Sequence, residues 1–264
     1  MMSSVPNSLA SPAVQALVTA LVQARQSGIP ADDASAGLQL QDAAQAYAVQ
    51  AAVAQALDLH AGQAPAHWKS GGPNRQAVLT HAPLPLAGVW MSPAVAGAWP
   101  FAMRGIEAEV ALRLGRAVDA DLAASLDVAS AAQLVDAMTV SIEVVDSRWQ
   151  RLTGAPALLR LADVQSHGAL VLGDWVPYVA RDWQAQICRL SISGQDEQMF
   201  TGTHTLADPA WLLRDWLLHA TRGGAVVPAG TVVTTGSWNG MTPALAGDKV
   251  RVRFDGIGEA SLQL

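Results

Sequence analysis

The stretch that decides the fold is Arg104-Gly-Ile-Glu-Ala-Glu-Val-Ala-Leu-Arg113, a β-rich run with two carboxylates at its centre. Alternate residues of a strand project to the same face, so Glu107 and Glu109 are expected side by side. Two like charges on one half-buried face repel each other unless a cation lies between them. The stretch therefore predicts a site for a hard divalent cation, Mg²⁺ or Mn²⁺, which prefers carboxylate oxygens. The alternative is a solvent-exposed edge strand with two hydrated glutamates.

A second β-rich stretch, Thr139-Val-Ser-Ile-Glu-Val-Val-Asp-Ser-Arg148, carries the lone carboxylate Glu143 among apolar neighbours. A glutamate in the middle of a buried strand requires a partner. Arg148 would satisfy it by forming a salt bridge. Alternatively, Glu143 is a third ligand of the cation. Three carboxylates would leave coordination positions open for water and substrate, as metal-assisted catalysis requires.

The composition argues against several classes of protein. The chain has 264 residues, of which 51% are hydrophobic and 14% charged, enough to bury a sizeable core. A net charge of −6 with no basic stripe argues against a nucleic-acid partner. No apolar run approaches the roughly 20 residues that span a bilayer, and no signal-peptide pattern is present. The single cysteine, Cys188, suits a reducing cytosol, so a cytoplasmic protein is expected.

The chain begins with helical patterns and continues with strand patterns. Ser11-Pro12, followed by apolar residues three and four apart, predicts an amphipathic helix that ends at Gly28. Residues 41–58 predict a second helix. Its expected buried stripe is Tyr47, Ala51, Ala54 and Leu57.

From Ala66 onward, short β-rich runs alternate with Gly and Pro, which is typical of a mixed sheet. Further helices are expected over residues 121–137 and 209–222, and further strands within residues 158–172, 186–193, 231–235 and 249–254. The sequence therefore predicts an α+β fold with two parts. These are an N-terminal helical segment, residues 1–64, and a mixed β-sheet domain, residues 65–264.

Other segments accompany the two carboxylate strands in a characteristic order. They are Asp42-Ala-Ala-Gln-Ala-Tyr-Ala-Val-Gln50, Trp68-Lys-Ser-Gly-Gly72, Gly168-Ala-Leu-Val-Leu-Gly173, and a C-terminal run with Trp211, Ala229-Gly230, Thr235-Gly236-Ser237 and Gly247-Asp248. Together, over about residues 40–264, they resemble the hydratase branch of the fumarylacetoacetate hydrolase superfamily, the 2-keto-4-pentenoate and 2-oxo-hepta-4-ene-1,7-dioate hydratases. The resemblance implies a mixed β-sheet roll of the fumarylacetoacetate hydrolase C-terminal-domain type and a homo-oligomer.

The resemblance also implies roles for residues outside the carboxylate strands. Lys69 matches a lysine that lines the hydratase site, where it would assist proton transfer or hold a substrate carboxylate. Its alternative is an ordinary surface lysine. Thr235, Gly236 and Ser237 match a segment that returns to the metal, where Gly236 allows close approach and Ser237 donates to a carboxylate oxygen. Its alternative is a plain turn. His167 is expected to be structural.

The chain departs from the hydratase pattern in one segment. The hydratases carry an aspartate in a proline-aspartate-aromatic-glycine segment, and this aspartate takes part in acid–base chemistry. The matching segment here is Pro85-Leu-Ala-Gly88, in which Leu86 cannot transfer a proton. His81, nearby in the chain, is the candidate substitute.

The resemblance and the three glutamates predict a metal-dependent hydratase, a hydro-lyase of aromatic catabolism. It would add water to a 2-hydroxy-2,4-dienoate or 2-oxo-4-enoate such as 2-keto-4-pentenoate. The predicted catalytic residues are Lys69 and Ser237, the substrate-binding residues Lys69, Thr235, Gly236 and Ser237, and the ligands of Mg²⁺ or Mn²⁺ Glu107, Glu109 and Glu143. Two alternatives stay open: a 4-oxalocrotonate-type decarboxylase of the same fold, and a subunit that binds a 2-oxo acid or a partner without turnover.

Overall fold

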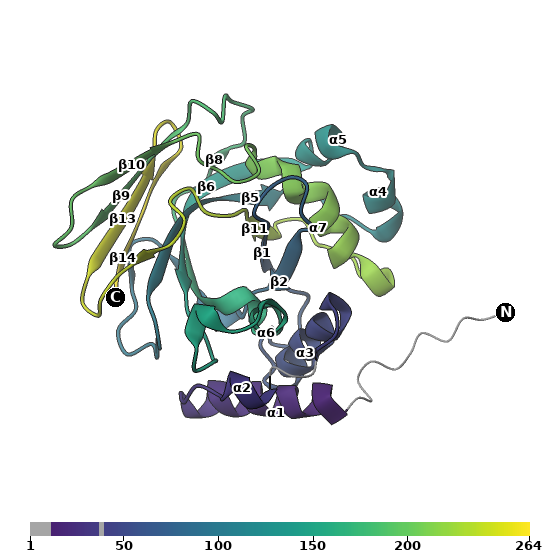
Figure 1. Cartoon of the computed structure of the whole chain (residues 1–264). Helices are drawn as coiled ribbons and strands as arrows, with labels where there is room; N and C mark the ends of the chain where they lie inside the picture. Colours follow the sequence, from purple (N-terminus) through teal and green to yellow (C-terminus); the bar gives the residue numbers. More distant parts are fainter. Residues whose placement is uncertain (1–11, 37–39) are drawn as a thin grey trace.

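The computed structural model describes residues 12–36 and 40–264 and has the predicted α+β fold. Three helices precede the sheets and lie together at one side of the molecule (Figure 1). They are α1 (Pro12–Ser27), α2 (Asp33–Ala36) and α3 (Ala43–Ala56). None of the helices in the described residues is both long and apolar enough to cross a membrane.

The two long N-terminal helices form where the sequence predicts them. The apolar positions of α1 are buried, and Gly28 follows the helix with φ +71°. Asp42 caps α3 by accepting from the backbone N–H of Gln45. The predicted stripe of α3 is wrong, because Ala51 is exposed and Tyr47, Ala54 and Leu57 are only partly buried. The buried residues are instead Ala46, Val49, Gln50 and Val53. This face of α3 packs on α1 and on α6 (Ala157–Ala162).

The larger sheet has nine strands among the described residues, seven of them in the order β2-β1-β11-β5-β6-β7-β3. β12 pairs with β5, and β8 pairs with β6. The strands are β1 (His67–Gly71), β2 (Thr80–Pro83), β3 (Val89–Met91), β5 (Gly105–Leu114), β6 (Val135–Val145), β7 (His167–Leu172), β8 (Val176–Pro177), β11 (Val232–Thr234) and β12 (Thr242–Pro243). β5 and β6 are antiparallel and central.

A second sheet of five described strands has the order β10-β9-β13-β14-β4. The strands are β4 (Ala94–Val95), β9 (Ile187–Ile192), β10 (Gln198–Thr201), β13 (Lys249–Phe254) and β14 (Gly258–Gln263). Ile106, Ala108 and Val110 of β5 share one hydrophobic core with buried residues of β9 and β13. Cys188 is a free, buried member of this core. Glu107 and Glu109 project from the other face of β5, away from this core.

The helix predicted over residues 121–137 is wrong. The structure has two short helices, α4 (Ala120–Ser125) and α5 (Val128–Ala132), and β6 already begins at Val135. Asp127 caps α5 with its side chain, which separates the two helices. Val135 pairs with Leu114 of β5, so sheet pairing overrides local helix propensity here. The later helix is present as α7 (Leu213–Ala220), preceded by a 3₁₀ turn at Pro209–Leu212.

One buried carboxylate connects the N-terminal helices to the sheet domain. Asp163 is 1% exposed and follows α6. Its carboxylate accepts from Arg148 Nε at 2.6 Å, from the Arg148 backbone N–H at 2.9 Å, and from Arg25 Nη2 of α1 at 3.2 Å. Arg25 and Arg148, which are distant in the sequence, thus share one carboxylate as their ion-pair partner.

We expect Asp163→Asn to lower the free energy of unfolding by about 3–5 kcal/mol, because it leaves the largely buried Arg25 without its ion-pair partner and Arg148 with only its 3.8 Å contact to Asp146. Urea unfolding followed by circular dichroism measures this. The matched control is Asp136→Asn, whose ion pair with Arg113 is 46% exposed on the carboxylate side. The control should change stability by less than about 1 kcal/mol, and similar losses in both variants would contradict the assignment.

Candidate active site

The three predicted carboxylates converge on one face of the larger sheet. Glu107 of β5 lies directly opposite Glu143 of β6, and Glu109 lies opposite Ser141. One oxygen of each glutamate lies within 4.8 Å of the others. Glu109 and Glu143 are buried and Glu107 is partly buried. The edge-strand alternative is wrong, because β5 is paired on both sides and nearly all of its residues are buried.

Glu143 is held by Lys69 and His167. Lys69 Nζ donates to Glu143 Oε1 at 2.5 Å and to the Gln165 carbonyl at 3.2 Å. His167 Nδ1 lies 3.1 Å from the same glutamate oxygen. The expected alternative, a salt bridge from Arg148 to Glu143, does not form, since Arg148 is bound to Asp163. Glu143 Oε2 is buried and has no hydrogen-bond partner among the described residues, so it is available to a cation.

Glu109 is held from β11 and the turn that follows it. Thr234 Oγ1 and the Gly236 backbone N–H both donate to Glu109 Oε2, the latter at 3.1 Å. Because the Thr234 proton is used there, Ser141 Oγ donates to Thr234 Oγ1 at 2.9 Å. Gly236 has φ +106°, a conformation that favours glycine. The predicted close approach of Gly236 is therefore observed, at the carboxylate of Glu109.

The side chains of Thr235 and Ser237, on either side of Gly236, do not bond to the three glutamates. Thr235 Oγ1 donates to the Val110 carbonyl at 2.7 Å and is fully buried. Ser237 Oγ donates to the Gly240 carbonyl at 2.5 Å and also contacts Asn239 Oδ1. In the described residues Ser237 is therefore bonded to its own turn and not to a glutamate, and its donation to a substrate stays a prediction. The alternation along β11 places Thr234, not Thr235, on the glutamate face.

The chemistry of the three carboxylates fits a divalent cation. Burial and the charge of Glu143 raise the pKa of Glu107 to about 8 and that of Glu109 to about 7. Burial also acts against ionisation of Glu143, but Lys69 and His167 outweigh it and lower its pKa. The site therefore holds carboxylates whose ionisation a cation would favour. Hard oxygen ligands with an open side suit Mg²⁺ or Mn²⁺.

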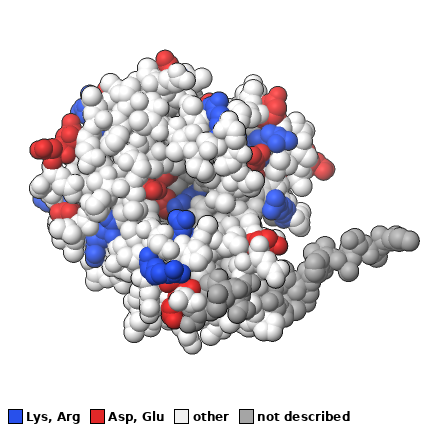
Figure 2. All heavy atoms as spheres, viewed as in Figure 1, with Lys and Arg blue, Asp and Glu red and all other residues white. Residues whose placement is uncertain are grey.

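A cavity of about 930 Å³ opens in front of the carboxylates. Figure 2 shows a hollow near the centre of the face drawn, with acidic and basic side chains in it. Lys69, Glu107, Glu109 and Arg160 are the charged residues that line the cavity. Burial lowers the pKa of Lys69, but the three glutamates outweigh this effect and leave the pKa above its usual value. Lys69 is thus a charged donor at neutral pH.

The loop after α6 has an unusual backbone. Val164, Gln165 and Ser166 have φ values of +51°, +53° and +59°. A β-branched residue such as Val164 rarely adopts this conformation, and such strain is typical of functional sites. Gln165 Nε2 and Ser166 Oγ are buried without hydrogen-bond partners among the described residues, and both residues line the cavity. Sequence patterns do not reveal these groups, because their placement depends on the turn.

The Leu86 segment lies away from this cavity. Leu86 is 50% exposed and is not among the lining residues. His81 does not line the cavity either, although its Nδ1 contacts the Ser70 hydroxyl at 2.8 Å. Burial lowers the pKa of His81 to about 3, so it is neutral. His81 therefore does not replace the missing aspartate as a group that touches the substrate.

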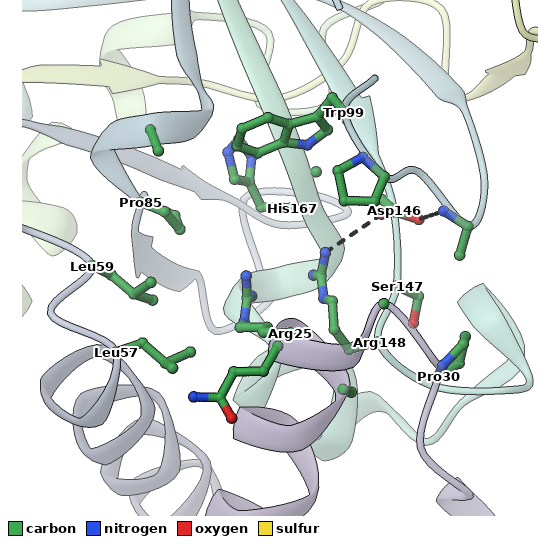
Figure 3. Close-up of a pocket in the computed structure, with 17 residues that line it drawn as sticks. Arg25, Pro30, Leu57, Leu59, Pro85, Trp99, Asp146, Ser147, Arg148 and His167 are labelled. Carbon is green, nitrogen blue, oxygen red and sulfur yellow. Dashed lines mark hydrogen bonds and ion pairs between the residues drawn. The ribbon is translucent and has the colours of Figure 1, made fainter. Parts of the chain in front are cut away.

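A second, smaller cavity of about 380 Å³ lies on the other side of His167 (Figure 3). Its lining includes Arg25, Leu59, Trp99, Asp146, Arg148 and His167. Arg148 and Asp146 form an ion pair at 3.8 Å in its wall. Since His167 Nδ1 contacts Glu143 while its ring lines this cavity, His167 lies between the cavity and the carboxylate cluster.

Comparisons with known proteins agree with this fold and identify the family. The family described as "Fumarylacetoacetate (FAA) hydrolase C-terminal" matches residues 67–264, so the chain belongs to the fumarylacetoacetate hydrolase family. Over 161 residues the chain is 32% identical to 2-keto-4-pentenoate hydratase 1 of Dechloromonas aromatica (strain RCB). That stretch covers 59% of this chain and 58% of the relative, which is less than two thirds of its length.

Two solved structures share the fold at low identity. One is 4-oxalocrotonate decarboxylase from Pseudomonas putida G7, complexed with magnesium and adipate. It has a TM-score of 0.81 and 19% identity, over 95% of this chain and 96% of that chain. The other is 5-carboxymethyl-2-hydroxymuconate delta-isomerase from Mycobacterium smegmatis, with a TM-score of 0.53 and 19% identity, over 76% of this chain and 78% of that chain.

The raised pKa values of Glu107 and Glu109 predict a pH-dependent metal site. Both values exceed those of the unfolded chain, so the metal-free protein should lose stability as pH rises from about 5 to about 8. Protons compete with the cation for the same oxygens. We therefore expect Mg²⁺ to raise the Tm more at about pH 8.5 than at about pH 6, as measured by differential scanning calorimetry.

Glu107→Gln should reduce this Mg²⁺-dependent rise in Tm, whereas Glu259→Gln, at an exposed surface pair, should not. An equal Mg²⁺ effect at both pH values, or an undiminished effect in Glu107→Gln, would contradict the metal site.

Proposed function

We propose that this protein is a divalent-metal-dependent hydratase that adds water to a 2-hydroxy-2,4-dienoate or 2-oxo-4-enoate, such as 2-keto-4-pentenoate. Glu107, Glu109 and Glu143 would hold Mg²⁺ or Mn²⁺. The single observation that carries the proposal is the convergence of these three carboxylates beside a cavity that Glu107, Glu109 and Lys69 line. The 32% identity to a 2-keto-4-pentenoate hydratase supports the choice of reaction.

The residues around the carboxylates would supply orientation and charge. Lys69, as a charged ammonium group, would donate to an acidic oxygen of the substrate or deliver a proton to its carbon skeleton. Thr234 and the Gly236 N–H hold Glu109 from one side, and His167 holds Glu143 from the other. Such supporting contacts keep metal ligands ionised and oriented.

A bound divalent cation would act as a Lewis acid towards negative charge on the 2-oxo oxygen. Hydration adds the proton and the hydroxyl of one water molecule across a carbon–carbon double bond. The apolar lining residues Val145, Leu158, Leu161 and Met241 would surround the carbon chain and limit other water. Gln165 Nε2 and Ser166 Oγ, which have no described partners, would be further polar contacts for the substrate or the attacking water.

A 2-oxo-enedioate decarboxylase is the second candidate. The most extensive structural likeness reported above is to a 4-oxalocrotonate decarboxylase, and Leu86 replaces the acid–base aspartate of the hydratases. Loss of CO₂ from the far carboxylate of such a substrate also builds negative charge, which the conjugated double bond carries to the 2-oxo oxygen, so the same charge stabilisation would serve it. A subunit that binds a 2-oxo acid or a partner without turnover is a third outcome of the same assay.

Incubating the purified chain with Mg²⁺ and 2-hydroxypenta-2,4-dienoate, and following the dienol absorbance, tests the proposal. We expect turnover that falls more than about 100-fold in Glu107→Gln, because a metal ligand should matter at least as much as an outer contact. Glu259→Gln is the control. CO₂ release from a 2-oxo-enedioate with no hydration would assign the decarboxylase, and saturable binding without product would leave only the binding role.

Lys69 can be tested separately from the metal. Lys69→Met should lower turnover by about 10²- to 10⁴-fold, because it removes the charged donor. Mg²⁺ affinity, measured by titration calorimetry, should persist because all three glutamates remain. Lys249, exposed on β13, provides the matched Lys249→Met control. Loss of Mg²⁺ binding in Lys69→Met would mean that Lys69 acts by holding Glu143 in place.

A further inference from the structure

One arginine in the wall of the catalytic cavity has no counter-charge. Arg160 lies on α6, its side chain is partly buried, and it lines the same cavity as Glu107, Glu109 and Lys69. Among the described residues its guanidinium makes none of the ion pairs, and its Nε is buried without a hydrogen-bond partner. Residues 1–11 and 35–39 contain no Asp or Glu, so they supply no counter-charge either.

The arginines that line the second cavity, unlike Arg160, have a carboxylate partner. Arg25 and Arg148, which line the second cavity, both form ion pairs with Asp163. A partly buried guanidinium is normally paired or hydrogen-bonded because its desolvation is costly. The exception at Arg160 therefore marks a place where an anion from outside the chain would compensate the charge.

The charges of the cavity indicate which anion this is. A divalent cation together with Lys69 would balance the three glutamates, so the metal end has no surplus charge when the cation is bound. Arg160 then remains as the one unbalanced cation among the charged lining residues. A 2-oxo acid that uses its first carboxylate at the metal end would leave Arg160 without a partner. A substrate with a second carboxylate would supply one, in the planar geometry that arginine favours.

The cavity has room for such a substrate. Its volume is about 930 Å³, and the apolar side chains of Val145, Leu158, Leu161 and Met241 belong to the same lining. Leu158 and Leu161 are on α6 with Arg160, so one helix contributes both apolar contact and charge. α6 is held to the N-terminal helices through its contact with α3 and through Gln50 Nε2, which donates to the Leu161 carbonyl. These contacts hold α6, and therefore the backbone of Arg160, in place beside the cavity.

We propose that Arg160 binds a second carboxylate of the substrate, so that this site takes a 2-oxo dicarboxylate in preference to a 2-oxo monocarboxylate. This inference rests on the proposed 2-oxo acid chemistry and narrows its substrate class to dicarboxylates, so that a monocarboxylate such as 2-keto-4-pentenoate would bind less tightly than a dicarboxylate of the same kind. It applies to hydration, in which the second carboxylate lies away from the carbon atoms that react, whereas a 2-oxo-enedioate decarboxylase would lose that second carboxylate as CO₂.

Two non-reacting ligands of equal chain length test the inference. 2-Oxoadipate and 2-oxohexanoate each have six carbons and differ in a terminal carboxylate or methyl group. Titration calorimetry with the full chain and Mg²⁺ should show 2-oxoadipate binding about 10- to 100-fold more tightly, the usual effect of a charged hydrogen bond. In Arg160→Gln the two affinities should become equal within about 2-fold, while binding of 2-oxohexanoate is unchanged.

Two further variants control for charge and for folding. Arg160→Lys should keep part of the preference for 2-oxoadipate, because it retains the charge but not the planar pair of donors. Arg116→Gln, at an exposed position, should keep all of it. Circular dichroism and the Tm of each variant confirm that the fold is retained.

The outcomes separate this inference from the proposed function. Equal binding of the two ligands by the unaltered protein, or an undiminished preference in Arg160→Gln, overturns the dicarboxylate assignment and leaves the 2-oxo acid site standing. Absence of Mg²⁺-dependent binding by both ligands overturns the two proposals together.

Discussion

The repulsion among three carboxylates on one buried sheet face is the constraint on which the rest of the site depends. Glu107 and Glu143 are cross-strand neighbours, and Glu109 lies one position further along the same face. Like charges in this arrangement are costly. The surrounding groups all act to offset that cost: Lys69 and His167 contact Glu143, and Thr234 and Gly236 contact Glu109. The arrangement suits a divalent cation, whose charge would offset the remaining repulsion.

The scaffold keeps these groups in register through elements that are far apart in the sequence. β5 and β6 supply the glutamates, β1 supplies Lys69, and β11 supplies Thr234, all within one sheet. The opposite face of β5 is packed in the core with the second sheet, so the strand cannot slip without burying its charges there. Asp163 then ties α1 and the segment after β6 to α6, which forms a wall of the cavity.

Within the fumarylacetoacetate hydrolase family, this chain combines a complete carboxylate cluster with a changed acid–base segment. Leu86 is half exposed and is not among the residues that line the cavity in front of the carboxylates, and His81 is buried and neutral. Stabilisation of charge on a 2-oxo oxygen is common to hydration and decarboxylation, whereas the proton donor and the far wall of the cavity distinguish one reaction and one substrate from another.

The sequence by itself determined the features that follow from the alternation of residues along a strand and from the residue types that cap helices. The alternation in residues 104–113 was enough to place Glu107 and Glu109 on one face, and the capping residues were enough to predict α1 and α3. The family followed from motifs in order. Only the tertiary structure decided that Lys69 and not Arg148 meets Glu143, and that Thr234 and not Ser237 meets a glutamate. It also decided that β6 begins inside the predicted helix, and that Arg160 and Gln165 line the cavity. Those outcomes depend on register between strands and on how α6 packs, and local periodicity carries no information about either.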